Sequence, residues 1–241
     1  MKKLMLLLFL VAGLIVSPTL ASAANVFTMN PYQLGQLYQV WEDPASSGTS
    51  LTSVFYFPGI GAVYNGTVLG TPGQGSIQIG ANSTGTPYGG GSGTEPTTTI
   101  LGLDSLSGYD AYKLIVANTN ENPWHYDLFF TSGNYLVTSQ NLAIVNGGVS
   151  TLSLDFSNAH VYNWPSLTEV GWRDVTSYAG IDLSNISAIG LSISAQVPMP
   201  GYGGNTDYVF ETTVAPVPEP TSMLLFGMGI LGLFGLKRKR A

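Results

Sequence analysis

Apolar residues in the body of this chain recur at every second position, which is the spacing of a β-strand with one buried face. The clearest case is STLSLDFS at 150–157, where Leu152, Leu154 and Phe156 fall on one side. Similar alternation, or a short apolar run, occurs between breaks of Gly, Asn, Ser and Pro in AYKLIVANT (111–119), YDLFFTS (126–132), YLVTSQ (135–140), ISAIGLSISA (186–195) and DYVFETTV (207–214). Short strands at regular spacing, without a helical pattern, predict an all-β protein.

The expected architecture is a single antiparallel β-sandwich, jelly-roll-like, over residues 24–215. The tract at 70–99 departs from the alternation, because its small residues can bury little apolar surface. We predict a long Gly/Thr-rich loop there, with at most one hairpin around Ile77 and Ile79. The tract is also compatible with a separate small N-terminal unit. We favour one domain, because residues 25–69 are few for an independent core and offer the strands SVFYF and GAVYNGTVL.

The first 23 residues have the three parts of a secretory signal peptide. Lys2 and Lys3 form a cationic head, residues 4–16 are apolar, and Ala21 and Ala23 supply an A-x-A cleavage site for signal peptidase. An uncleaved anchor needs a longer apolar span. The sequence therefore predicts an exported chain that begins near residue 24.

The C-terminal segment, 216–241, combines a proline–acid–proline triplet, an apolar stretch and a cationic cluster. The triplet is Pro218, Glu219 and Pro220, residues 221–236 carry no charge, and the basic tail 237–240 consists of Lys237, Arg238, Lys239 and Arg240. The apolar stretch is shorter than the ~20 residues that span a bilayer comfortably. We expect a marginal transmembrane helix over about 221–236, with the cations on the cytoplasmic side and the body outside.

This C-terminus, paired with a signal peptide, resembles the PEP-CTERM sorting signal of exported bacterial proteins. The resemblance implies processing near Pro218-Glu219-Pro220 by a membrane protease-transpeptidase of the exosortase type, with loss of the tail. It also implies a Gram-negative bacterium that makes exopolysaccharide and biofilm, with the protein in the cell envelope, on the outer surface or in the extracellular matrix. The activity of the body stays open, because the bodies that carry this signal are diverse.

A second resemblance covers about half of the body. The pieces are Gly108-Tyr109-Asp110 before a strand, NPWHYDLFF at 122–130 and GWRDVTSYAGIDLSNISAIGLSI at 171–193. They are similar to jelly-roll, galactose-binding-like domains found as carbohydrate-binding modules, in which a framing motif like Asp182-Leu183-Ser184 through Gly190 leads into a late strand. The match concerns residues that lead into strands and includes no active-site signature, so it favours the sandwich fold more than it favours sugar binding.

The charge of the exported part excludes nucleic acid as a partner. Removal of the signal peptide and the basic tail leaves Lys113 and Arg173 against 14 acidic residues, a formal charge of −12. Phosphate binding needs cations, whereas an acidic surface suits divalent cations or uncharged partners such as neutral polysaccharide. The chain has no cysteine and two histidines, which argues against thiolate or histidine-rich metal sites. Calcium with oxygen ligands, for example Asp207 and Glu211, stays open.

Three tryptophans are the candidate ligand contacts. Trp124, Trp164 and Trp172 stand beside Asn, Pro and acidic residues, as sugar-stacking rings do when amides and carboxylates bind the hydroxyls. The alternative is that they are core or edge aromatics, because large aromatic side chains are mostly buried. The densest polar and aromatic cluster is NPWHYD at 122–127, in which we interpret His125 as a structural histidine.

Two functions of different classes stay open at this stage. We expect a non-enzyme and nominate no catalytic residue, because G-x-S-x-G, H-E-x-x-H and a thiol nucleophile are all absent from the sequence. The first function is a non-catalytic binding or structural module associated with extracellular polysaccharide. The second is a secreted polysaccharide-active hydrolase with a carboxylate pair, which no local signature selects. A purely structural surface protein, with every aromatic buried, is a third possibility.

Overall fold

The computed structural model describes residues 25–42, 50–68, 76–82, 105–120, 123–164, 166–194 and 208–218. These ranges form strands and one helix of four residues, α2 (Pro31–Leu34). The expected signal peptide, 1–23, and the expected membrane helix, 221–236, lie outside them. Within the described residues there is no helix of the length and apolar character that crossing a membrane requires.

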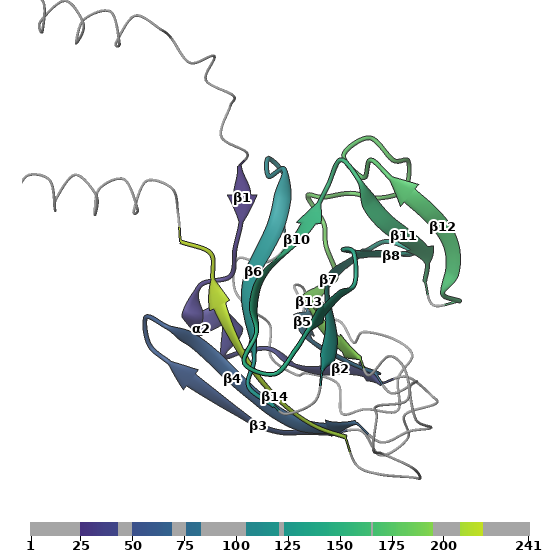
Figure 1. Ribbon diagram of the computed structural model, residues 1–241. Helices are drawn as coiled ribbons and strands as arrows, with labels where there is room; N and C mark the ends of the chain where they lie inside the picture. The colour runs from purple at the N-terminus through teal and green to yellow at the C-terminus, as the bar shows by residue number, and fades with distance from the viewer. Residues whose placement is uncertain are drawn as a thin grey trace, which may run out of the picture.

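The first sheet has six strands (Figure 1). Their order is β1 (Val26–Phe27), β6 (Ala111–Asn118), β14 (Tyr208–Pro216), β4 (Gly61–Val68) and β3 (Ser50–Phe57), with β10 (Val149–Asp155) on the other side of β6. Every pair is antiparallel except β1 with β6, which is parallel. The prediction of a purely antiparallel sandwich is wrong for that pair. β14 and β1 share one edge of β6. β14 pairs with residues 114–118, which leaves the first residues of that edge to pair with β1.

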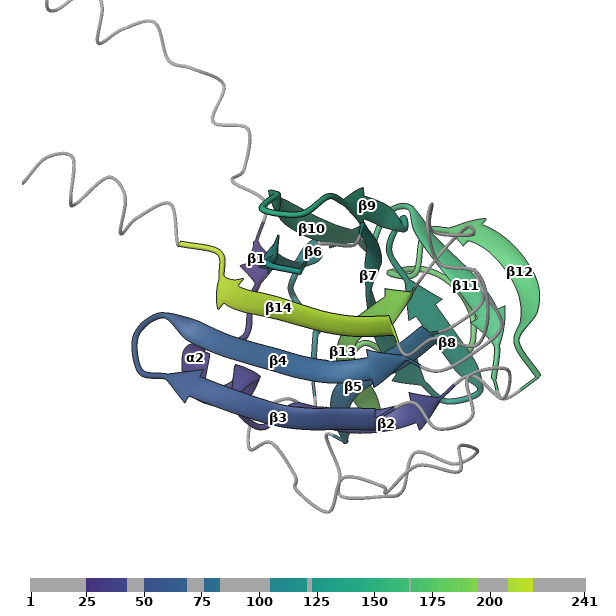
Figure 2. The ribbon, with the colours of Figure 1, turned by 60° about the horizontal axis from the view of Figure 1, so that its bottom comes forward.

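The second sheet has eight strands, all paired antiparallel. Their order is β12 (Thr168–Arg173), β11 (Ala159–Asn163), β8 (Tyr135–Thr138), β7 (Trp124–Ser132), β13 (Ala188–Ser194), β5 (Ser76–Asn82) and β2 (Tyr38–Glu42), with β9 (Leu142–Ile144) beside β7. Figures 1 and 2 both show β12 at the end of the molecule opposite the turn between β3 and β4.

The hydrophobic core lies between the two sheets. Leu152, Leu154 and Phe156 are all buried in it, which confirms the one-sided pattern of the sequence. They meet buried side chains from the eight-stranded sheet, such as Leu128 and Phe130, in one cluster. Full burial of a side chain of this size contributes about 1.5–3 kcal/mol to folding. The two packed sheets confirm the all-β fold class.

Part of the glycine-rich tract is a strand in the interior of a sheet. β5 lies between β13 and β2, and its Ile77 and Ile79 are fully buried. The hairpin allowed around Ile77 and Ile79 is instead a single strand, 76–82, which pairs with strands distant in sequence. Two isoleucines are enough to anchor this strand in the core. Gly80 lies opposite Gly190 of β13, and because neither residue has a side chain, the two backbones approach closely. The remaining parts of the tract lie outside the described residues.

Candidate functional site

The side of the eight-stranded sheet that is turned away from the core, here called the outer face, carries the polar and aromatic residues. The residues of strand β7 show which side chains belong to which face, because successive side chains of a strand point to opposite sides of the sheet. Trp124 and Tyr126 belong to the core cluster, so His125 and Asp127 point to the outer face. The NPWHYD cluster of the sequence is thus divided between the interior and the outer face.

Trp124 is a core residue. Its side chain has no exposed surface, and its ring packs edge-on against Phe210 of β14, with the ring centroids 5.8 Å apart and the planes at 76°. A ring without an exposed face cannot stack on a sugar. The assignment of Trp124 as a ligand contact is therefore wrong, because the strand alternation directs this side chain toward the opposite sheet.

Trp164 is half-buried on the outer face. With Tyr162 it packs against a second, smaller cluster formed by Phe129, Leu136 and Ala188. The backbone N–H of Trp164 donates to the carbonyl of Asn134 at 2.7 Å, which joins the connection between β11 and β12 to the turn between β7 and β8. Trp164 therefore contributes to the same face as the ligand candidate Trp172, mainly through packing.

Trp172 is the exposed member of the three tryptophans. It lies on the edge strand β12, and 45% of its surface is exposed. Its ring is parallel to the ring of His160 on β11, with the centroids 4.9 Å apart and the planes at 7°. His160 and Trp172 are direct cross-strand partners, so the strand register itself produces the stack.

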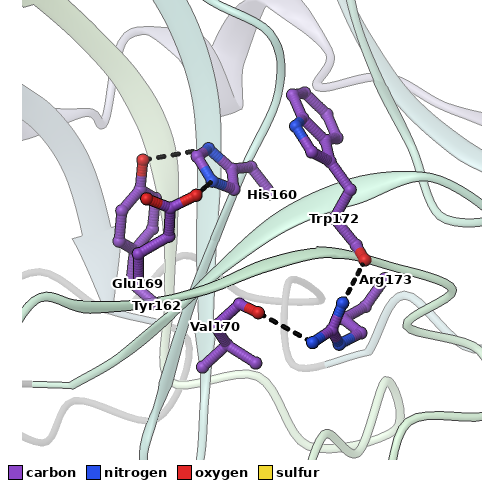
Figure 3. Close-up of polar contacts among 6 residues, drawn as sticks. All are labelled: His160, Tyr162, Glu169, Val170, Trp172 and Arg173. Carbon is purple, nitrogen blue, oxygen red and sulfur yellow. Dashed lines mark hydrogen bonds and ion pairs between the residues drawn. The ribbon is translucent and has the colours of Figure 1, made fainter.

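His160 is the centre of a hydrogen-bonded row (Figure 3). Its Nδ1 lies 2.9 Å from the Tyr162 hydroxyl, and its Nε2 lies 2.8 Å from Oε1 of Glu169. A neutral imidazole with its proton on Nε2 satisfies both contacts, since it donates to the carboxylate and accepts from the phenol. Burial, followed by the carboxylates of Glu169 and Asp127, raises the pKa of Tyr162. The phenol therefore stays neutral and keeps its hydrogen at physiological pH.

Arg173 stabilises the end of β12 and does not reach outward. Its guanidinium donates to the carbonyls of Trp172, at 2.7 Å, and Val170, at 2.8 Å (Figure 3). Gly171 between them has a φ of 99°, in the left-handed region that favours glycine. The side chain of Arg173 thus holds the irregular backbone that presents Trp172.

Asp127 is the second notable group on the outer face. Its Oδ1 is inaccessible to solvent and has no hydrogen-bond partner. Burial raises the pKa of Asp127 to about 7, although a hydrogen bond with Ser192, its cross-strand partner on β13, lowers it in part. A carboxyl group that titrates near neutrality is a feature of general acids as well as of buried structural groups.

The two acidic residues of the outer face, Asp127 and Glu169, are on distant strands. Strands β8 and β11 lie between β7 and β12. Three strand spacings separate the backbones by about 14 Å. The carboxyl pairs of glycosidases are about 5–10 Å apart. The backbones of β7 and β12 are thus farther apart than the carboxyl groups of a glycosidase pair, although both carboxylates lie close enough to the Tyr162 hydroxyl to raise its pKa.

The described residues contain no group of three or more His, Asp or Glu side chains arranged to hold a metal ion. The carboxylate of Glu211 accepts a hydrogen bond from the Thr119 hydroxyl at 2.7 Å. Asp207, its expected companion, lies outside the described residues. Calcium binding stays a prediction.

Sequence reasoning nominated none of His160, Tyr162 and Glu169, and it included Asp127 only as part of the NPWHYD cluster. A signal was present in AHVYN (159–163) and TEVGWR (168–173), which flank a short turn-forming stretch and suggest a hairpin. Alternation places His160 and Tyr162 on one face. The register that brings Trp172 onto His160 includes a bulge between Val161 and Tyr162, which the sequence does not reveal.

The last strand leads directly into the C-terminal segment. The N–H of Val217, just after β14, donates to the hydroxyl of Thr28 at 3.1 Å, and the triplet, the apolar stretch and the cations follow. Residues 216–240 match the PEP-CTERM protein-sorting motif. This sorting motif confirms the predicted signal, and it implies export to the bacterial cell envelope or surface and processing by an exosortase-type enzyme. Pro218 is the last described residue of the triplet; Glu219, Pro220 and the basic tail lie beyond it.

No curated protein matches the chain in sequence. Among solved structures, an exo-β-agarase is similar with a TM-score of 0.39 and 10% identity, over 82% of this chain and 26% of the agarase chain. The protein PfGH50B is similar with a TM-score of 0.33 and 12% identity, over 72% of this chain and 23% of its own. The chain thus spans about a quarter of each of these proteins. Likenesses of this size carry no conclusion about the site.

Proposed function

We propose that the chain is an exported protein of the outer surface or extracellular matrix of a Gram-negative bacterium, and that its β-sandwich is a non-catalytic module that binds extracellular polysaccharide. In this proposal signal peptidase removes residues 1–23. The C-terminal helix then holds the protein in the membrane until an exosortase-type enzyme cuts near Pro218-Glu219-Pro220. The sorting motif supports the export, and the outer face supports the binding.

The exposed indole of Trp172, held flat against His160, is the observation that carries the binding proposal. The C–H faces of pyranose rings pack on aromatic rings of this kind. A ring that is already fixed by a neighbour loses little side-chain freedom when a ligand binds. The exposed carboxylate of Glu169 and the hydroxyl of Tyr162 stand beside this ring and suit the hydroxyl groups of a sugar.

The charge of the exported part indicates which polysaccharide is favoured. A formal charge of −12 repels a polyanion, and the exposed carboxylate of Glu169 adds to that repulsion at the site itself. We therefore expect a neutral polysaccharide as the ligand. An acidic polysaccharide would require a bridging divalent cation such as calcium.

A polysaccharide-active hydrolase is the second candidate, and Asp127 is the observation that favours it. An acid with a pKa of about 7 is suited to protonate a leaving group, and Glu169 on the same face offers a second carboxylate. The separation of about 14 Å between the backbones of β7 and β12 supports binding over hydrolysis.

Affinity electrophoresis of residues 24–216 through gels that contain neutral glucans, neutral galactans or alginate, with and without calcium, tests the proposal. Reducing-sugar release is measured in parallel. The proposal expects retardation by a neutral polysaccharide without sugar release. Sugar release that disappears in Asp127→Asn would replace it with the hydrolase. Unretarded migration in every gel would contradict binding and favour a structural envelope protein.

A further inference from the structure

One end of the six-stranded sheet carries a group of exposed apolar side chains. They surround the turn between β3 and β4 and the neighbouring helix α2, and we call them the apolar tip; they are Tyr32, Phe55, Tyr56, Phe57 and Ile60. Ile60, at the turn itself, has 64% of its surface exposed. Exposed apolar groups that gather in one place mark a contact surface more often than isolated ones do.

Internal contacts hold the apolar tip together. Tyr32 of α2 and Tyr56 of β3 meet edge to face, with ring centroids 6.3 Å apart. The N–H of Ile60 donates to the carbonyl of Phe57 at 3.1 Å, and Gly59 between them has a φ of 77° that suits a tight turn. The apolar side chains are therefore presented by a hydrogen-bonded hairpin end.

The apolar tip is also free of charge. Residues 26–37 and 50–68, which build it, contain no Asp, Glu, Lys, Arg or His. The 14 acidic residues of the chain all lie outside these two ranges, and the one nearest to the end of β14 in sequence is Glu219. An uncharged surface of Tyr, Phe and Ile has the composition of protein segments that lie at a membrane–water interface. Burial of a charge at that depth would be costly.

The chain leaves the domain at Pro216, the end of β14, and we call this point the chain exit. Its position indicates what covers the apolar tip. β4 begins at Gly61 and its antiparallel neighbour β14 ends at Pro216, so the hairpin turn and the exit lie at the same end of the sheet (Figures 1 and 2). A Cβ at Gly61 would lie only 3.0 Å from Cα of Ala215, so the two segments are in direct contact.

The length of chain between the domain and the apolar stretch is short. Three residues lead from Pro218, the last described residue, to residue 221, where the uncharged stretch of the sorting motif begins. Three residues span at most about 10 Å. If the stretch 221–236 enters a bilayer, the end of β14 and the apolar tip beside it are brought to the bilayer surface.

We propose that the apolar tip is a membrane-contact surface, which lies in the headgroup region of the bilayer while the sorting segment is inserted. This inference rests on the proposed function, namely on membrane insertion of the C-terminal helix before processing. The contact orients the domain, because β12, the strand that contains Trp172, lies at the opposite end of the molecule (Figure 2). The outer face therefore points away from the bilayer, into the space outside the cytoplasm.

Single-cysteine variants test this contact directly, because the chain has no cysteine of its own. Three variants of residues 24–241 are reconstituted into uncharged phosphatidylcholine vesicles: Ile60→Cys at the tip, Leu225→Cys in the sorting segment, and Val209→Cys as the control. Val209 is 51% exposed on the same sheet, but seven residues of β14 place it about 23 Å from Pro216. The rate of reaction with a charged, impermeant maleimide is measured with and without vesicles.

We expect vesicles to slow the reaction of Leu225→Cys and of Ile60→Cys, the latter about tenfold, because burial of even one of the remaining tip side chains, such as Phe57, favours the membrane-bound position by that factor. Val209→Cys should react at the same rate in both conditions. Phe57→Cys, on the other side of the turn, repeats the test should Ile60→Cys fail to fold by near-ultraviolet circular dichroism. If Ile60→Cys and Phe57→Cys react as Val209→Cys does while Leu225→Cys is protected, the membrane contact is overturned and tail insertion stands. If vesicles do not protect Leu225→Cys, both the membrane contact of the apolar tip and the insertion of the sorting segment are overturned.

Discussion

Asp127 is the residue whose environment conflicts most with its charge. Its Oδ1 is buried without a hydrogen-bond partner, and burial raises its pKa to about 7 from the ordinary value of 3.8. The folded state therefore holds a proton that the unfolded state releases between about pH 4 and pH 7. Stability is fully present below this window and falls as the pH rises through it.

Asp127→Asn should remove this dependence. A pKa shift of three units corresponds to at most about 4 kcal/mol. At pH 8 the free energy of unfolding of the variant should therefore exceed that of the wild type by up to this amount, and at pH 4 the two should differ little. Urea unfolding at pH 4, 6 and 8 measures the difference. Glu169→Gln, an exposed carboxylate on the same face, should retain the wild-type slope. A slope in Asp127→Asn equal to that of the wild type would show that Asp127 does not titrate in this window.

The tryptophans differ in what each one stabilises. Trp124→Ala opens a cavity between the sheets and should cost about 3–5 kcal/mol of unfolding free energy. Trp172→Ala removes a half-exposed ring and should cost less than about 1 kcal/mol. Denaturant unfolding of the two variants measures these two losses of stability. Equal losses would contradict the assignment of one ring to the core and the other to the surface.

At the scale of elements, the pairing of β5 with β13 depends on two facing glycines, Gly80 and Gly190. A Cβ at Gly190 would overlap the carbonyl oxygen of Ile79 and lie 2.6 Å from Cα of Gly80. The ring of Phe129 covers the same place, at 2.9 Å. The absence of side chains here thus allows β7, β13 and β5 to share one sheet beneath an aromatic ring.

Gly190→Ala should therefore be strongly destabilising, by about 2–4 kcal/mol, because backbone and not a flexible side chain must move. Gly108→Ala is the control. Gly108 has a φ of 84° and open space around it, so that substitution should cost only about 1–2 kcal/mol of backbone strain. Thermal unfolding compares the two. A midpoint for Gly190→Ala at or above that of Gly108→Ala would contradict the close approach of β5 and β13.

Strands with a regular alternation of apolar and polar residues could be recognised from the sequence. β10 is an example, because Leu152 and Leu154 fall on one face in sequence and in structure. For β5 the sequence indicated only a possible hairpin around Ile77 and Ile79, because its surroundings are rich in glycine and its true partners are distant in sequence. Long-range pairing also decides the site. Trp172 meets His160 only through the bulged register of β11 and β12.

On the scale of the whole molecule, the two proposed surfaces lie at opposite ends. The apolar tip adjoins the chain exit at Pro216, whereas the outer face extends to β12 at the far end. A protein held at its C-terminus by the sorting motif would then turn its ligand face away from the membrane. This arrangement was not evident from the sequence, which shows the C-terminal segment but not the neighbours of the exit.

Replacement of Pro218, Glu219 and Pro220 by alanine should block processing. The expected result is a full-length species retained in the membrane fraction, detected by immunoblot of fractionated cells, while the wild type yields a shorter form outside the membrane. Ser177→Ala, at an exposed position remote from the sorting motif, should process normally. Release of the triple-alanine protein at the wild-type rate would show that the triplet does not direct sorting.

The measurement that tests the central claim most directly is the dissociation constant for the polysaccharide retained in the affinity gels, compared among the wild type, Trp172→Ala and Phe55→Ala. Phe55 is an exposed aromatic residue on the other sheet. Loss of the stacked indole should cost about 2 kcal/mol, roughly a thirtyfold weaker binding, and Phe55→Ala should bind as the wild type does. Undiminished binding by Trp172→Ala would contradict the assignment of the outer face as the polysaccharide-binding surface.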